Sequence, residues 1–175
     1  MEYEKIAKKN RKKNIIDYTL PTNKRVNFGL PEVKKLTPHR DPFLLLDSIE
    51  TVDFENRTIS GKKKINPENP VFKGHFPAYP IYPGVLQVEM IGQLAICYYS
   101  LSKSGSLEVK ETNAKLGVRA LKIFHTLFQN EVLPGDEVTI TAKVLESDEY
   151  KFKGIGQVLK DGSVCTVAIA EFYIV

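Results

Sequence analysis

Alternating hydrophobic and polar residues mark the C-terminal third of the chain as extended structure. In EVTITAKVLE (137–146), apolar residues from Val138 to Val144 fall at every second position, which places them on one face of a strand. Three further segments have strand-like composition: AKLGVRALKIF (114–124), YKFKGIGQVL (150–159) and SVCTVAIAEFYIV (163–175). Residues 160–162, KDG, are typical of a hairpin turn between the last two. The pattern after residue 113 therefore predicts an antiparallel meander.

The segment VLQVEMIGQLAICYYSLSK (85–103) has a different pattern, because it is apolar on nearly every side. A helix of this kind is buried rather than amphipathic. The overlapping SKSG, which closes on Gly105, is expected to end it. Residues 66–84 contain five prolines and are predicted as an irregular loop.

The N-terminal half of the chain supplies the remaining elements. LPEVKKL (30–36), with Pro31 near its first position, favours a short helix. PFLLLDSIETVDF (42–54) is apolar and strand-like, and ENR (55–57) favours a turn. TISGKKKI (58–65) can return as the partner strand, and its three consecutive lysines indicate an exposed edge.

One long buried helix and a set of antiparallel strands predict an α+β fold, in which a highly curved antiparallel sheet wraps around the helix. We assign residues 1–30 to a basic N-terminal extension and residues 31–175 to this domain. Such a sheet has an open edge and one face that its own helix does not cover. We expect dimerisation to cover them.

At 175 residues, 42% of them hydrophobic, the chain is long enough for one domain with its own core. It contains no apolar run of the roughly 18–20 residues that a membrane span needs, and its N-terminus lacks the apolar core of a secretory signal. Cys97 and Cys165 lie in apolar patterns without CxxC spacing, so we expect reduced core residues in a cytoplasmic protein. Three histidines without a second Cys/His cluster argue against a structural zinc site.

The net charge of +4 is concentrated at the N-terminus. Residues 1–30 hold eight basic and three acidic side chains, whereas residues 31–175 hold seventeen basic and eighteen acidic ones. The tail KKNRKKN (8–14) favours a solvated, partly disordered arm. The alternatives are contact with an acidic protein, a membrane surface or nucleic acid. Nucleic acid is the least favoured, because the body has no basic stripe with interleaved aromatic residues.

Glu89 stands in the middle of the apolar helix, where a lone carboxylate is costly to bury unless it is neutral, paired or functional. Gln93 lies four residues on, on the same helix face, and can hydrogen-bond Glu89. Gly92 also lies on this face and leaves space in which a small group can approach the carboxyl group. The alternative is that Glu89 simply reaches solvent at the edge of the helix.

His75 lies in KGHFP, directly before the evenly spaced Pro77, Pro80 and Pro83. Each proline fixes its own φ and restricts the preceding residue, so the run follows a defined, extended path. Such stiffness suits a catalytic loop that positions an imidazole. The same stiffness would also suit a PxxP ligand for an SH3-like partner. A further alternative is that His75 simply lies on the surface.

The neighbours of these two residues complete a chemical set. Ile81 can offer a backbone carbonyl that orients the His75 ring, and the Gly84 amide lies at the positive end of the helix dipole. The imidazole can take a proton α to a thioester, the amide can stabilise the enolate-like oxygen, and the Glu89 carboxylic acid can protonate a β-hydroxyl as it leaves. The set is therefore suited to water elimination from a 3-hydroxyacyl compound.

Three blocks of the sequence also match a known family. LTPHRDPFLLLD (36–47), NPVFKGHFPAYPIYPGVLQVEMIGQ (69–93) and VLPGD (132–136) occur in this order and resemble the 3-hydroxyacyl-acyl carrier protein dehydratases of fatty-acid synthesis. The resemblance covers about residues 31–175. It implies a hotdog fold, which is a curved antiparallel sheet around one central helix.

The resemblance further implies a homodimer, or a trimer of such dimers, in which catalytic His75 of one subunit meets catalytic Glu89 of the other. Gly84 and Ile81 take the places of the amide that stabilises the oxyanion and the carbonyl that orients the ring. Gln93 and Gly92 remain substrate-binding candidates. The implied substrate is a thioester on the phosphopantetheine arm of an acyl carrier protein, with no metal and no bound cofactor. A glutamate at this position resembles the dehydratase branch rather than the dehydratase–isomerase branch.

Several positions depart from the family pattern. Gln129, Asn130 and Glu131 stand where a basic pair is common, which leaves the tail, Lys73 or Arg119 to supply positive charge for an acidic carrier. Ala78 replaces a frequent loop glycine, and Asp41 replaces an aromatic residue. These departures favour a specialised pathway, a different carrier or an unusual acyl chain.

Two other functions compete with the dehydratase. A hotdog thioesterase would use a carboxylate and a water molecule but would not need the loop histidine. A non-catalytic acyl-carrier binding protein would need neither His75 nor Glu89. Of the other histidines, His39 is expected to be structural and His125 to lie on the surface at the end of a strand.

Overall fold

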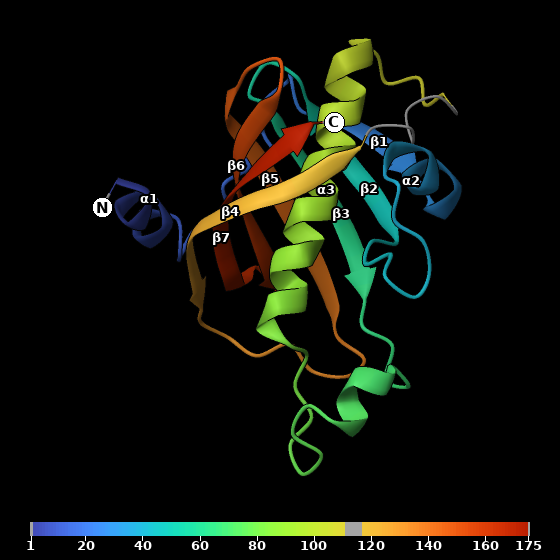
Figure 1. The fold of residues 1–175 in the computed structure, drawn as a ribbon, viewed down its shortest axis with the longest axis vertical. Helices are drawn as coiled ribbons and strands as arrows, with labels where there is room; N and C mark the ends of the chain where they lie inside the picture. Colours follow the sequence, from blue (N-terminus) through green and yellow to red (C-terminus); the bar gives the residue numbers. More distant parts are fainter. Residues whose placement is uncertain (1, 111–116, 175) are drawn as a thin grey trace.

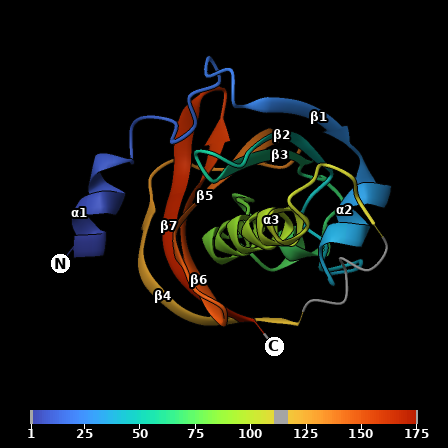
Figure 2. The same cartoon turned by 90° about the horizontal axis from the view of Figure 1, so that it is seen from above.

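The computed structural model describes residues 2–110 and 117–174 and shows an antiparallel sheet curved around one long helix (Figures 1 and 2). The helices are α1 (Glu2–Lys9), α2 (Leu30–Leu36), α3 (Gly84–Ser104) and the short 3-10 helix η1 (Pro70–Lys73). The strands are β1 (Lys24–Phe28), β2 (Ser48–Asp53), β3 (Thr58–Lys64), β4 (Val118–Phe128), β5 (Glu137–Ser147), β6 (Lys151–Lys160) and β7 (Ser163–Ile174). Their spatial order is β1-β2-β3-β5-β6-β7-β4. The predicted α+β architecture is confirmed.

Helix α3 forms the centre of the core, as the apolar pattern predicted. Every residue from Met90 to Leu101 is buried, and the sheet curves around the helix in the view from above (Figure 2). Pro83 precedes the first turn, and Gly105 ends the helix in the left-handed conformation with φ of 59°. Glycine adopts this conformation at little cost, so the chain can turn away here.

The C-terminal meander is also confirmed. β5, β6 and β7 pair in sequence, and Asp161 and Gly162 form the two-residue turn between the last two with φ of 49° and 77°. Positive φ at both positions matches the right-handed twist of the hairpin. The strand predicted over 114–124 is observed as β4, which pairs with β7. Residues 114–116 of that prediction lie outside the described part of the chain.

Two predictions for the N-terminal half are wrong. Only the second part of the predicted strand 42–54 is a strand. Leu44–Leu46 are not paired in the sheet, and their apolar character reflects burial in the core. β3 is not an edge strand, since it lies between β2 and β5. Its lysines are compatible with this place because Lys62 pairs with Glu137 and Lys63 with Asp47.

The prediction for the N-terminal tail holds only in part: its basic side chains are exposed to solvent, but the segment packs on the sheet instead of forming a free arm. α1 packs on the outer side of the sheet over β4 and β7, where Ala7 is fully buried and the Tyr3 ring lies 4.4 Å from that of Phe124 (Figure 2). One face of α1 is apolar and consists of Tyr3, Ile6 and Ala7. The charged residues between them made this amphipathic pattern hard to recognise in the sequence. Strand β1, within the predicted extension, pairs with β2.

Close packing of α3 on β6 depends on glycine. A Cβ atom on Gly156 would lie 2.2 Å from the Ile91 Cγ2 atom and 2.6 Å from the Thr141 carbonyl oxygen. The carbonyl belongs to the neighbouring strand and cannot move aside without disturbing the ladder. The absent side chain therefore sets the distance between helix and sheet.

We predict that Gly156→Ala lowers the free energy of unfolding by about 1–3 kcal/mol, the usual cost of overpacking a core. The measurement is denaturant unfolding at a fixed protein concentration. Gly74→Ala is the matched control, because a Cβ atom there meets nothing within 4 Å, and its effect should stay within about 0.5 kcal/mol. Equal effects of the two substitutions would contradict this account of the packing.

Candidate active site

The His75 ring is oriented by the loop that follows it. His75 Nδ1 lies 2.8 Å from the Ile81 carbonyl oxygen, as the sequence suggested. A carbonyl can only accept, so the proton of the neutral ring resides on Nδ1 and the lone pair is on Nε2. The imidazole is thus held in the form that can accept a proton at Nε2.

Backbone strain adjoins this histidine. Phe76 has φ of 59°, a conformation that an aromatic residue rarely adopts, and its ring lies 4.2 Å from the His75 ring. Strain of this kind costs on the order of 1–3 kcal/mol and persists where the surrounding structure imposes it. The bond from Tyr79 N–H to the Phe76 carbonyl, at 2.8 Å, helps to close this turn. The His75 ring is therefore fixed from two sides.

His75 and the first turn of α3 line one cavity of about 420 Å³. The Gly84 amide has no hydrogen-bond acceptor within the described ranges, and it belongs to the positive end of the α3 dipole. A Cβ atom on Gly84 would lie 2.5 Å from the Phe128 ring, so glycine is needed for this ring to approach. The cavity thus joins a proton acceptor to an unused N–H donor.

Glu89 is held by the fully buried side chain of Gln93. Gln93 Nε2 donates to Glu89 Oε1 at 2.9 Å and to the Phe43 carbonyl at 2.8 Å, while its Oε1 accepts from Leu45 N–H at 2.8 Å. The two backbone partners fix the orientation of the amide, because one can only accept and the other can only donate. The predicted hydrogen bond between Gln93 and Glu89 is confirmed. Glu89 keeps 32% of its side chain exposed.

His39, which the sequence analysis expected to be structural, is a neighbour of Glu89. Its Nε2 lies 3.4 Å from Glu89 Oε1, and its Nδ1 lies 2.6 Å from the Thr37 hydroxyl. Burial lowers the pKa of His39, an effect that Glu89 partly opposes. The ring is therefore neutral at pH 7 and can direct its Nε2–H toward the carboxylate, with Thr37 donating to Nδ1. Only the family block that contains His39 could have indicated this role.

Gly92 lies beside Glu89, next to an apolar cavity of about 70 Å³. The space that Gly92 was expected to leave beside the carboxyl group is small. A Cβ atom on Gly92 would come within 3.3 Å of the Phe172 ring. Ala120 and Ile123 of β4 line the same cavity. The Glu89 carboxyl group and the edge strand β4 therefore border the same cavity.

His75 and Glu89 do not meet within one chain. They line separate cavities, and no hydrogen bond or ion pair joins them in the part of the chain that the structure describes. β4 connects the two cavities, since Phe128 lines the first and Ala120 and Ile123 line the second. The two cavities therefore lie at different positions along one edge strand, and each contains one of the two candidate residues.

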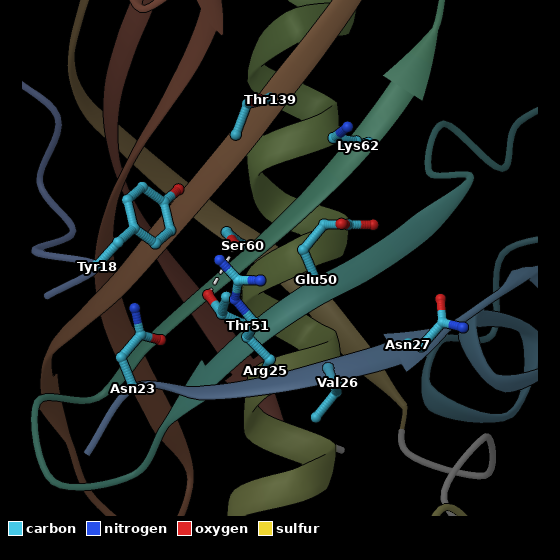
Figure 3. A pocket seen from close by; sticks show the side chains of 10 residues that line it. All are labelled: Tyr18, Asn23, Arg25, Val26, Asn27, Glu50, Thr51, Ser60, Lys62 and Thr139. Atoms are coloured by element: carbon cyan, nitrogen blue, oxygen red, sulfur yellow. Dashed lines mark hydrogen bonds between the residues drawn. The ribbon is translucent and has the colours of Figure 1, made fainter. Parts of the chain in front are cut away.

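Another cavity, of about 740 Å³, contains neither residue. It lies against β1, β2, β3 and β5, on the side of these strands turned away from α3 (Figure 3). The residues that line it are Tyr18, Asn23, Arg25, Val26, Asn27, Glu50, Thr51, Ser60, Lys62 and Thr139. Thr51 and Ser60 are hydrogen-bonded to each other, with their hydroxyl oxygens 2.7 Å apart. No histidine is among these lining residues.

Three other residues of the His75 cavity were not singled out from the sequence: Tyr82, Gln87 and Phe128. Gln87 is buried and accepts a hydrogen bond from the Thr166 hydroxyl at 2.7 Å. Burial raises the pKa of Tyr82 to about 12, so its hydroxyl stays protonated.

His125, expected on the surface, is instead half-buried within β4, because α1 covers the outer side of this strand.

Comparison with known proteins bears on the family of this chain. The FabA-like domain model matches residues 37–169. The 3-hydroxyacyl-[acyl-carrier-protein] dehydratase FabZ of Clostridioides difficile (strain 630) is 40% identical over 116 residues, 66% of this chain and 75% of the relative. FabZ of Anaeromyxobacter sp. (strain K) is 37% identical over 141 residues, 80% of this chain and 85% of the relative.

A solved structure shares the fold. The dehydratase heterocomplex ApeI:P from Xenorhabdus doucetiae contains a chain that aligns with a TM-score of 0.61 and 15% identity, covering 82% of this chain and 90% of that one. At this identity the likeness concerns the fold alone. The family match and the curated relatives carry the assignment: the chain belongs to the FabA-like, hotdog-fold family of 3-hydroxyacyl-[acyl-carrier-protein] dehydratases.

Proposed function

We propose that the protein eliminates water from 3-hydroxyacyl thioesters on an acyl carrier protein and releases trans-2-enoyl thioesters in the synthesis of fatty acids or related acyl chains. Two observations together support this proposal. The His75 ring is oriented so that its Nε2 lone pair is free, and the Glu89 carboxyl group is positioned by the buried Gln93 amide. The curated relatives named as FabZ dehydratases support the same reaction.

The proposed reaction uses His75 and Glu89 as the two halves of one site. His75 Nε2 takes the proton from C2 of the acyl chain, and the Gly84 N–H stabilises the negative charge that develops on the thioester oxygen. The protonated Glu89 carboxyl donates its proton to the C3 hydroxyl, which leaves as water while the C2–C3 double bond forms. The proton on His75 then returns to Glu89, directly or by exchange through solvent, which restores the neutral imidazole and the protonated carboxyl group.

We infer a homodimer, because one chain holds the two groups apart. β4 is an edge strand with exposed apolar side chains: Leu121 is 54% exposed, Ile123 57% and Phe128 56%. Pairing β4 with a second copy in antiparallel fashion would cover these side chains. It would also set the residue-128 end of one strand, beside His75, against the residue-120 end of the other, beside the partner's Glu89.

We predict that His75→Ala and Glu89→Gln each lower kcat on the order of 10²–10⁴-fold, the usual contribution of a positioned acid–base group. The assay follows the ultraviolet absorbance of the enoyl thioester, with substrate on a carrier or a short pantetheine mimic. His125→Ala is the matched control, because this histidine lies outside both cavities. Wild-type rates in a folded His75→Ala variant would favour an acyl-carrier binding protein. Hydrolysis of saturated acyl thioesters without dehydration would favour a thioesterase.

Mixing the two inactive variants tests the shared site. Heterodimers contain one intact site, built from His75 of one chain and Glu89 of the other. After exchange of equal amounts, activity should recover to about one quarter of the wild-type value if the interface is a symmetric twofold one. Native mass spectrometry would verify that heterodimers have formed. Inactive heterodimers would exclude a site shared between subunits.

The contact between His39 and Glu89 predicts a positioning role for His39. His39→Leu should lower kcat about tenfold and move the alkaline limb of the pH profile upward, because the ionised carboxylate loses a nearby donor. His39→Gln keeps an N–H donor near the position of Nε2 and should restore much of the loss. A merely structural role would lower the thermal midpoint in the His39→Leu variant without moving the pH profile.

A further inference from the structure

The basic segment Asn10–Lys13 is tied to the sheet through its backbone. Gln157, fully buried on β6, donates from Nε2 to the Asn10 carbonyl at 2.5 Å and to the Lys13 carbonyl at 2.7 Å. Its Oε1 accepts from Ile15 N–H at 2.9 Å. Gln129 Nε2 donates to the Arg11 carbonyl at 2.5 Å. The chain thus uses one buried amide and one surface amide to hold this segment in place.

The cationic side chains of the same segment are free. Arg11, Lys12 and Lys13 are exposed, and none of them forms an ion pair within the described ranges. Lys8, by contrast, pairs with Glu4 at 2.7 Å. Three neighbouring positive charges repel one another, so an ordered cluster without counter-charges is a surface that favours an anionic partner.

The cluster borders the entrance to the His75 cavity. Gln129, which binds the Arg11 carbonyl, also lines that cavity. The nearby acidic group is Glu131, which lines the cavity too and accepts a hydrogen bond from the Tyr79 hydroxyl at 2.7 Å. Figure 2 places the N-terminal segment on the outer side of β4 and β7, away from α3. Positive charge is therefore presented outside the cavity, while His75 remains inside.

We propose that Arg11, Lys12 and Lys13 form a docking surface for an acidic acyl carrier protein, whose phosphate-linked arm then enters the His75 cavity. The inference rests on the proposed function. A thioester at His75 must be attached to an arm that leaves through the cavity entrance, and the phosphodiester and the carrier surface then lie outside. Charges beside the entrance can hold the carrier without contacting the reacting atoms.

The test compares two triple charge reversals. Arg11→Glu/Lys12→Glu/Lys13→Glu should raise KM for the carrier-bound substrate about tenfold at low salt, with kcat and the KM for the pantetheine mimic unchanged. Lys24→Glu/Lys103→Glu/Lys110→Glu changes the charge of the chain equally. Its exposed side chains lie on β1 and around the C-terminal end of α3, and it should leave both KM values near those of wild type. Added salt should reduce the difference between the first variant and wild type.

The outcomes separate this inference from the function it rests on. Absence of dehydration of the pantetheine mimic by the wild-type protein would refute the proposed function. A normal rate on the mimic with an unchanged KM for the carrier substrate in the first variant would overturn the docking surface alone. Loss of binding to vesicles rich in anionic phospholipid, with carrier kinetics intact, would assign the segment to a membrane surface instead. Equal KM increases in both variants would indicate a non-specific charge effect and would also overturn the docking surface.

A neutral triple variant, Arg11→Gln/Lys12→Gln/Lys13→Gln, should give a KM for the carrier-bound substrate between those of wild type and the charge-reversal variant.

Discussion

Burial of an apolar helix inside a curved sheet is the constraint on which the rest of this structure depends. α3 has no solvent-facing side from Met90 to Leu101, so the sheet must surround it. Gly156 on the inner face of β6 lets the helix approach closely. A polar group on such a helix needs a partner within the core or a place at its edge. Glu89 and Gln93 satisfy this requirement together, and they do so in the half of α3 nearest the His75 loop.

The polar chemistry gathers at the first turns of α3 because its later turns are closed to solvent. The Gly84 amide begins the helix, the His75 loop precedes it, and Glu89 follows within two turns. Gln93 links Glu89 to the irregular segment around Phe43 and Leu45, whose backbone groups are not paired in the sheet. One glutamine thus serves two purposes: it satisfies a non-repetitive stretch of backbone, and it positions a carboxyl group.

The outer face of the sheet is organised by a second glutamine. Gln157 is buried because the N-terminal segment lies over it, and that segment is fixed because Gln157 supplies its hydrogen bonds. Residues 2–30 therefore have a structural role on the sheet as well as an excess of positive charge. Packing of Ala7 and the ring contact of Tyr3 with Phe124 add apolar burial to these polar contacts.

The sequence by itself determined the central helix, the C-terminal meander with its turn at Asp161 and Gly162, and the candidates His75 and Glu89. These features have local causes: hydrophobic periodicity, positive φ at a turn, and a carboxylate where apolar residues are expected. Other features depended on residues far apart in the chain. In the irregular Leu44–Leu46 stretch, the Leu45 N–H donates to Gln93 rather than to a neighbouring strand, and β3 is central because β5 pairs with it. The approach of His39 to Glu89 and the packing of α1 were likewise decided only by tertiary structure, because no local pattern encodes which distant surface will cover a side chain.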